Sequence, residues 1–457
     1  MRQALLLVLV AGCTTVGPDY KRPEMPLPAQ FPTQGSEEGP SVASDWWTLY
    51  SDATLNELVA SARSNNADLR VAAAQVQEAE AVVRQARAAL FPEITGSFTR
   101  TRSRVGSLTA PPPAATAPLE RNDARLVAST QFEIDFWGRF GRADEAARAA
   151  LLGSQLAREV VGLTIGGLTA QTYFGLRSLD AQIVALDNTI RLRRESLDIA
   201  RARASAGLTS ELDVHQAQGA LSDALVQRRE AGRQRALLER QLAQLSGKLD
   251  LKVAGGDLFA LPVPPTPPAG LPSSLLERRP DIRAAEQTMI AANAQIGVAR
   301  AARFPAVSLT AFLGGQSAAV EDIASSGVWG LGLGIVGPLF DAGRREALEH
   351  QAAARYQQTL ASWQRSVEGA FREVSDALVN LEETSASETE LRARVEAARN
   401  ALELSRIRYE SGYSPYLEVL DAQRTANDAE IAFVRNRQAR LAFSVDLMRA
   451  LGGGWQP

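Results

Sequence analysis

Residues 408–423 read RYESGYSPYLEVLDAQ, and this stretch governs how the rest of the chain is arranged. Gly412 inside a helical pattern, followed by Pro415, is a common way to end one helix and begin another. Residues 203–218, RASAGLTSELDVHQAQ, carry the same glycine, leucine, acidic residue, valine and glutamine at the same spacing. The chain therefore contains one helix–turn–helix stretch twice, which predicts two copies of one elongated unit.

The composition favours long helices and argues against nucleic-acid binding. The 457 residues carry a formal net charge of −3 at pH 7, so no basic surface for nucleic acid is expected. Aromatic residues make up only 6% of the chain, and Ala, Arg, Glu, Gln and Leu fill long segments. Such a bias is typical of long packed helices.

The N-terminus has the features of an exported lipoprotein. Residues 1–12 combine a charged start with a short apolar run, which predicts a secretory signal peptide. The run LVAGC at residues 9–13 resembles a bacterial lipobox, in which the cysteine is acylated; the alternative is a small hydrophobic residue inside the signal. Cys13 is the only cysteine, so a disulfide within one chain is impossible. No Asp follows Cys13, so we expect an outer-membrane location, with residues 13–44 as a lipidated, extended arm.

The first repeat is predicted to span residues 45–260. After Phe91-Pro92 the period changes from helical to alternating, and strands are expected at about 93–105 and 125–136. The proline-free sequence that follows predicts a long helix at about 139–206, which would reach roughly 100 Å. A return helix is expected at 208–246.

The second repeat follows the same plan after a proline-rich linker at 261–272. It is predicted to span 273–451, with strands at about 306–314 and 328–338, a long helix at about 344–410, a return helix at 415–451 and a tail at 452–457. The long helices carry a coiled-coil seam at Leu391, Val395, Ala398, Leu402, Ser405 and Tyr409, matched in the first repeat by Leu186, Ile190, Arg193, Leu197, Ala200 and Ala204.

The four predicted strands cannot close a barrel alone, because about eight strands is the smallest useful number. An open sheet leaves unpaired edges, and lipid tolerates such edges least. One apolar strand face and a neighbouring lipid anchor suggest that the sheet lies in a membrane, where three copies would supply twelve strands. The alternative is a small soluble sandwich.

Taken together, these segments resemble the outer-membrane factor family of tripartite efflux systems, TolC-like or OprM-like, in its NodT-type lipoprotein branch. The resemblance covers nearly the whole mature chain. It is carried by the lipobox with Val16-Gly17-Pro18-Asp19-Tyr20, by Asp45-Trp46-Trp47, by residues 276–282 (LERRPDI), by Phe91-Pro92 and Phe304-Pro305, and by Leu417 to Gln423.

The resemblance implies a membrane α+β fold: a homotrimer with a twelve-stranded transmembrane β-barrel, four strands per chain, continuous with a long periplasmic α-helical coiled-coil barrel. It implies a passive exit duct that conducts drugs or other small molecules. The implied partners are a periplasmic adaptor, an inner-membrane RND-type transporter and outer-membrane lipid.

The same resemblance implies a gate at the periplasmic tip. Family positions matching Tyr409, Leu417, Glu418 and Asp421 lie on the inner helix pair there. We expect Asp421 and Glu418 to form an acidic ring around the threefold axis, and Leu417 an apolar constriction. Arg408 with Tyr409 would hold the closed state. The alternative is a solvated turn with Tyr409 in the helix–helix seam.

Two further observations bear on function. Ser414 stands where family gates carry an arginine after the turn glycine, so one closing bond is expected to be missing. His215 and His350 are the only histidines, and no H-E-x-x-H, G-x-S-x-G or Walker pattern occurs. We therefore expect no enzyme activity, no metal and no cofactor beyond the lipid on Cys13. A structural periplasmic coiled-coil lipoprotein, a lipoprotein enzyme and a type I secretion exit duct remain as alternatives.

Overall fold

The structure, a computed structural model, describes residues 15–28, 31, 44–104, 120–266 and 272–454. The predicted signal peptide 1–12 and Cys13 lie outside these residues. The chain forms two compact units, each built from three segments. The first unit takes its described residues from Met1–Glu24, Gln75–Ser154 and Ala284–Trp363, and the second from Met25–Ala74, Gln155–Arg283 and Gln364–Pro457.

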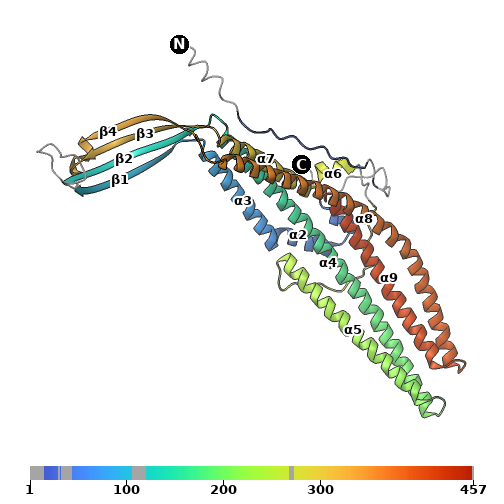
Figure 1. The fold of residues 1–457 in the computed structure, drawn as a ribbon. Coiled ribbons are helices and arrows are strands. Elements are labelled where there is room, and N and C mark those ends of the chain that lie inside the picture. Colours follow the sequence, from blue (N-terminus) through green and yellow to red (C-terminus); the bar gives the residue numbers. More distant parts are fainter. Residues whose placement is uncertain (1–14, 29–30, 32–43, 105–119, 267–271, 455–457) are drawn as a thin grey trace, which may run out of the picture. The chain divides into compact units, whose positions relative to one another are not determined.

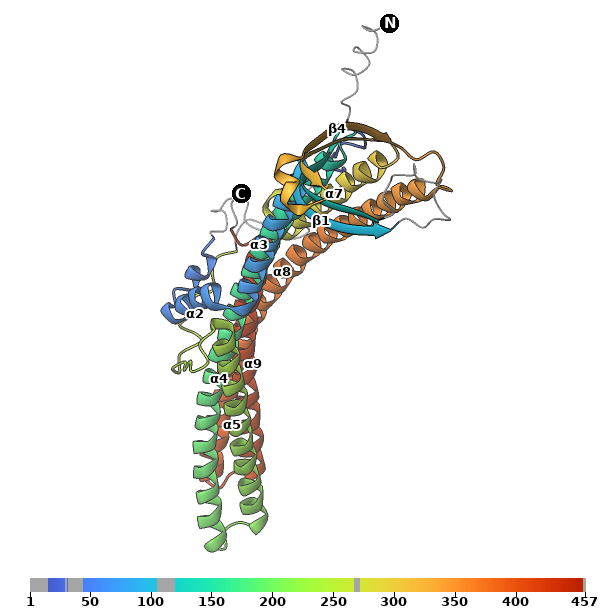
Figure 2. The same cartoon turned by 90° about the vertical axis from the view of Figure 1, so that its left-hand side faces the viewer.

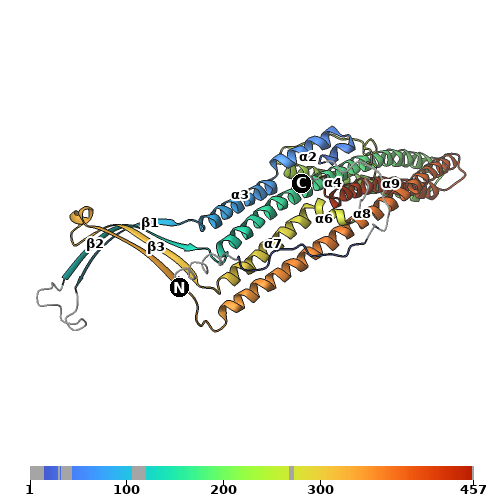
Figure 3. The same cartoon turned by 90° about the horizontal axis from the view of Figure 1, so that it is seen from above.

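The first unit contains one antiparallel sheet. Its strands are β1 (Glu93–Arg104), β2 (Glu120–Ile134), β3 (Ala306–Ser317) and β4 (Gly327–Val336), and they lie side by side in chain order (Figure 1). The second strand begins at Glu120, five residues before the expected 125, because Glu120 pairs with Arg104 and accepts a 2.6 Å hydrogen bond from Arg102. The segment between β3 and β4 curls back over the end of the sheet as the 3-10 helix η3, Val320–Ser325 (Figure 3).

The two faces of this sheet differ in chemistry. Successive side chains of a strand point to opposite faces, and the register places Phe98 opposite Leu126. That face is mainly apolar, with Ile94, Phe98, Leu126, Leu313, Trp329, Leu331, Leu333 and Ile335 all exposed. Towards the end of β1 it also carries Arg100 and Arg102. The other face carries Thr95, Ser97, Ser129, Gln131, Ser308, Thr310, Gly330, Gly332 and Gly334. The alternation predicted from the sequence therefore corresponds to two different faces of the sheet. One is mainly apolar, and the other, here called the small, polar face, carries small and polar side chains.

Helices account for most of the chain. Beyond the long pairs they are η1 (Trp46–Tyr50), α2 (Ala53–Asn65), α3 (Ala67–Ala88), η2 (Pro272–Ser274), α6 (Leu275–Arg278) and α7 (Pro280–Ala301). The long helices are α4 (Arg139–Ser205), α5 (Glu211–Ser246), α8 (Arg344–Glu410) and α9 (Tyr416–Ala450). Within the described residues, no helix combines the length and the hydropathy needed to cross a membrane.

The core of the second unit gathers aromatic side chains around α4. Trp46, Tyr50 and Phe174 are fully buried, and the Tyr50 hydroxyl lies 2.7 Å from Ser444 Oγ on α9. Burial of these large rings supplies much of the apolar stabilisation. Lower down, α4, α5, α8 and α9 run alongside one another to the two turns (Figure 2). The helix pairs are thus held by one apolar cluster near η1 and by separate clusters near the turns.

Both turns have the conformation that their glycines allow. Gly207 and Gly412 have φ values of 69° and 81°, in the left-handed region that glycine adopts without strain. Ser210 caps α5 by accepting a hydrogen bond from the Leu212 amide, and Pro415 is the cap residue of α9. The return helices therefore begin at Glu211 and Tyr416, not at 208 and 415, because the preceding residues form the turns.

Candidate functional site

One arginine joins the two turns at the helix tips. Arg203 Nη1, near the end of α4, donates a 2.6 Å hydrogen bond to the main-chain carbonyl of Tyr409 on α8. Its guanidinium also lies over the Tyr409 ring, 4.7 Å from the ring centroid. Together a charge-assisted hydrogen bond and a cation–π contact tie the end of the first hairpin, formed by α4 and α5, to the end of the second, formed by α8 and α9.

Tyr409 is a packing residue in this arrangement. Its side chain is 4% exposed, and its ring lies 5.6 Å from that of Tyr416. The cluster around them includes Ile190, Leu197, Ala200, Ala217 and Val419. The Tyr409 hydroxyl is buried without a hydrogen-bond partner among the described residues, and burial raises its pKa. Tyr409 is therefore neutral at physiological pH and contributes its ring and its carbonyl, not its hydroxyl group.

The other expected gate residues are exposed and paired locally. Arg408 Nε lies 3.2 Å from Glu418 Oε1, so this ion pair closes the turn of the second hairpin on itself. Asp421 Oδ1 lies 2.7 Å from Nη2 of Arg424, one helical turn on. Leu417 is 60% exposed. The structure thus brings Tyr409 into the seam and leaves Arg408, Leu417, Glu418 and Asp421 on the surface of one chain.

Sequence reasoning missed the residue that joins the turns. Arg203 has the same place before the first turn as Arg408 has before the second, and a basic residue in the last turn of a helix is ordinary. Nothing local in the sequence distinguishes these two arginines. In the described part of the chain, no group of three or more metal-ligating side chains is placed to hold a metal ion.

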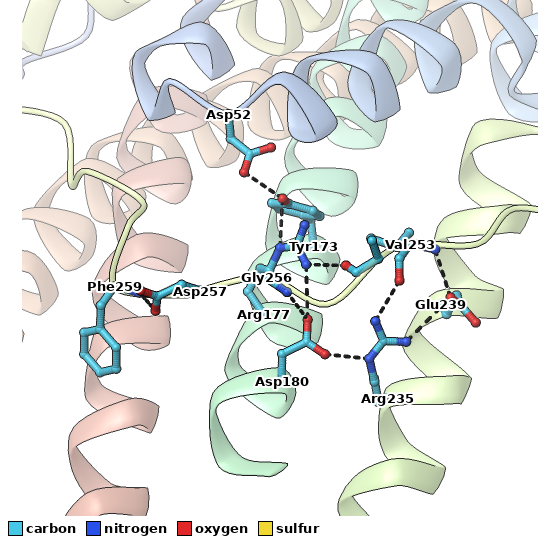
Figure 4. Close-up of polar contacts among 11 residues, drawn as sticks. Asp52, Tyr173, Arg177, Asp180, Arg235, Glu239, Val253, Gly256, Asp257 and Phe259 are labelled. Carbon is cyan, nitrogen blue, oxygen red and sulfur yellow. Dashed lines mark hydrogen bonds and ion pairs between the residues drawn. The ribbon is translucent and has the colours of Figure 1, made fainter. Parts of the chain in front are cut away.

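A second polar site holds the segment Gly247–Leu261, here called the strap, against α4 and α5 (Figure 4). Asp180 on α4 lies at the centre of this polar site. The carboxylate accepts hydrogen bonds from Arg177 Nη1 at 3.1 Å, from Arg235 Nε at 2.6 Å and from the Gly256 amide at 3.2 Å. A side chain at Gly256 would overlap the Arg177 guanidinium, so glycine lets the strap pass directly over that charge.

The two arginines around Asp180 bind the strap as well. Arg177 Nη1 donates to the Ala254 carbonyl at 2.6 Å, and Arg235 Nη2 to the Val253 carbonyl at 2.7 Å. At its far end the strap reaches the second hairpin, where the Phe259 ring stacks on Phe433 of α9 at 5.0 Å. The strap therefore connects the two helix pairs well above their turns.

The N-terminal arm, residues 15–24, lies along α7 and is fixed by a buried carboxylate (Figures 1 and 3). Glu286 on α7 accepts a 2.9 Å hydrogen bond from the Tyr20 hydroxyl. It also accepts two from Arg22, at 2.7 and 2.8 Å. Asn293 Nδ2 donates to the Pro18 carbonyl at 2.8 Å. Residues 18–22 are thus held on α7 by specific polar contacts.

Glu286→Ala is expected to release this arm. The substitution removes three hydrogen bonds, two of them from a guanidinium, and bonds to charged groups are worth about 1.5–3 kcal/mol. Tryptic cleavage after Lys21 should then be roughly tenfold faster than in the wild type, because local opening becomes easier. Mass spectrometry of the released peptides gives the rate. Glu78→Ala on the exposed side of α3 is the matched control, and equal rates in the two variants would contradict the assignment.

Comparisons with known proteins define the class. The family model for outer membrane efflux proteins matches residues 58–248 and 271–453. The cation efflux system protein CusC of Escherichia coli is 33% identical over 465 residues, which cover 98% of this chain and 97% of CusC. The outer membrane protein OprJ of Pseudomonas aeruginosa is 33% identical over 471 residues, covering 99% and 95% of the two chains. The solved outer-membrane channel OprN superposes with a TM-score of 0.90 at 29% identity, over 97% of this chain and 100% of OprN.

The chain belongs to the outer membrane efflux protein family. It is an outer-membrane efflux channel of the kind used by tripartite pumps, and its location is the outer membrane, as the sequence predicted. The predicted combination of long helices with a small antiparallel sheet is also confirmed.

Proposed function

We propose that three copies of this chain form a passive exit duct, with a twelve-stranded barrel in the outer membrane and a helical barrel in the periplasm. The observation that carries the proposal is the four-stranded sheet, which has β1 and β4 as its edges among the described residues and which exposes large apolar side chains from all four strands on one face. Unpaired edges cost several kcal/mol per group in lipid, and pairing β4 with β1 of another copy removes them.

The test is the mass of the detergent-extracted protein together with its conductance in planar bilayers. A trimer that forms pores supports the duct. A soluble rod, obtained after the signal and Cys13 are removed, would support a structural coiled-coil lipoprotein instead. A monomer without pores would contradict the duct. Export of a protein substrate by cells would favour a type I secretion duct over small-molecule efflux.

The proposed gate lies at the helix tips. Asp421 and Glu418 would form the acidic ring and Leu417 the apolar constriction, while Arg408 would stiffen the second turn through its pair with Glu418. Tyr409 has its partner in Arg203, which binds its carbonyl and stacks on its ring. Opening the tip requires the second hairpin to move away from the first, so this contact must break.

The partners follow from the same proposal. Cys13 would carry lipid, and the arm held by Glu286 would set where that lipid enters the membrane. The tips expose apolar side chains at Leu208, Leu212, Tyr413 and Leu417, which suit contact with a periplasmic adaptor that connects to an RND-type transporter. The cargo would be small molecules. CusC is named for cations and a relative from Pseudomonas putida for toluene, and the transporter would do most of the selecting.

No enzyme activity is part of this proposal. Asp180 at the strap and Arg203 at the tips both take part in structural contacts between helices and neighbouring segments. Apart from the lipid on Cys13, we propose no cofactor.

A further inference from the structure

The small, polar face of the sheet carries one stacked cation. Arg125 on β2 and Phe312 on β3 both belong to this face, since Phe312 pairs with Ser129 and Arg125 with Gln316. The Arg125 side chain lies along the strand, and its Cζ atom is 4.9 Å from the centroid of the Phe312 ring. Among the described residues of this face, Phe312 is the single aromatic side chain.

A glycine on the neighbouring strand leaves the space that the Phe312 ring occupies. Gly330 of β4 pairs directly with Phe312 of β3. A Cβ atom at Gly330 would overlap Cε1 and Cζ of the Phe312 ring. The ring therefore occupies the space that a side chain at 330 would need, and it offers a flat platform to Arg125.

The guanidinium on this platform has no counter-ion in the described part of the chain. No carboxylate of the described residues forms an ion pair with Arg125, and its Nε is buried without a hydrogen-bond partner. The nearest acidic side chain on the same strand face, Asp123, accepts a 2.7 Å hydrogen bond from Gln316 instead. A half-buried guanidinium that stacks on a ring but pairs with no carboxylate is free to bind an anion.

We propose that Arg125, stacked on Phe312, is an anion-binding site on the inner wall of the channel. The inference rests on the proposed trimeric barrel, in which the apolar face meets lipid and the polar face meets the lumen. Three copies place three such sites around one lumen, where lining charges set ion selectivity. The ligand class is organic anions with carboxylate or sulfonate groups, which a planar guanidinium binds through paired hydrogen bonds.

The experiment measures block of single channels by pyrene tetrasulfonate, added on the side of the strand loops, in planar bilayers holding the full-length protein. Arg125→Gln is expected to weaken the block roughly tenfold and to shift the reversal potential in a potassium chloride gradient toward cation selectivity. Arg100→Gln is the matched control. Arg100 lies on the neighbouring strand but on the apolar face, opposite Ala124, so wild-type block and selectivity are expected.

Each outcome distinguishes this inference from the function on which it rests. Wild-type block in Arg125→Gln, or an equal loss in Arg100→Gln, overturns the site but leaves the duct intact. A wild-type protein without pores overturns the duct. If Arg125→Gln does not insert, Arg125→Lys decides: it keeps the charge but not the planar stack, so we expect an unchanged reversal potential with weaker block. Block equal to the wild type in Arg125→Lys would contradict the role of the stacked pair.

Discussion

The Arg203→Ala variant is expected to open the periplasmic tip and to raise the mean single-channel conductance several-fold. Arg203 ties the end of the second hairpin to the first, through the Tyr409 carbonyl at 2.6 Å and the Tyr409 ring. A hydrogen bond from a charged donor contributes about 1.5–3 kcal/mol, and a cation–π contact adds about 0.5–2 kcal/mol. Losing both shifts a closed–open equilibrium by at least roughly tenfold in each protomer.

Two control variants separate the contact from a general loss of packing. Tyr409→Phe keeps the ring and the carbonyl and removes a hydroxyl that has no partner among the described residues, so conductance close to the wild type is expected. Arg201→Ala removes an exposed arginine two residues away. Conductance in Arg203→Ala no higher than in these controls would show that Arg203 does not hold the tip. A rise in Tyr409→Phe would instead assign the closing bond to the hydroxyl group.

The contrast between Gly412 and Arg203 shows what the sequence could predict. Gly412 and Pro415 act on their own backbone, so the turn and its copy at Gly207 could be found from local chemistry. The alternation of β1 likewise follows from the pleat. The partner of Arg203 lies on another helix more than two hundred residues along the chain, and no local pattern identifies it.

The same limit applies to the arm. Tyr20 and Arg22 belong to a proline-rich stretch that predicts only an extended segment. Their common partner, Glu286, is one of many carboxylates on helices, where a pair with a nearby arginine is the ordinary expectation. Charged pairs between distant segments depend on the tertiary fold, so the sequence could predict the elements but not these contacts.

Asp180→Ala is expected to destabilise the protein and to free the strap. The substitution leaves Arg177 and Arg235, whose side chains are 7% and 20% exposed, without their shared carboxylate. Removing one partner from a buried ion pair costs about 3–5 kcal/mol, because the remaining charge stays desolvated. An apparent melting temperature lower by roughly 3–5 °C is expected in detergent. Tryptic cleavage after Lys252, an exposed residue of the strap, should be faster.

The control for this variant lies on the same helix. Asp187 pairs with Arg228 at 3.1 Å, but both side chains are about half exposed, so Asp187→Ala should cost at most about 1 kcal/mol. A lower melting temperature in Asp180→Ala without faster cleavage at Lys252 would mean that Asp180 stabilises the helices but does not hold the strap. Asp180 and Arg203 are roughly 35 Å apart along α4, so their effects should be additive in the double variant. In Arg203→Ala alone, the strap would still fix the helix pairs above the open tip, whereas the double variant loses both contacts.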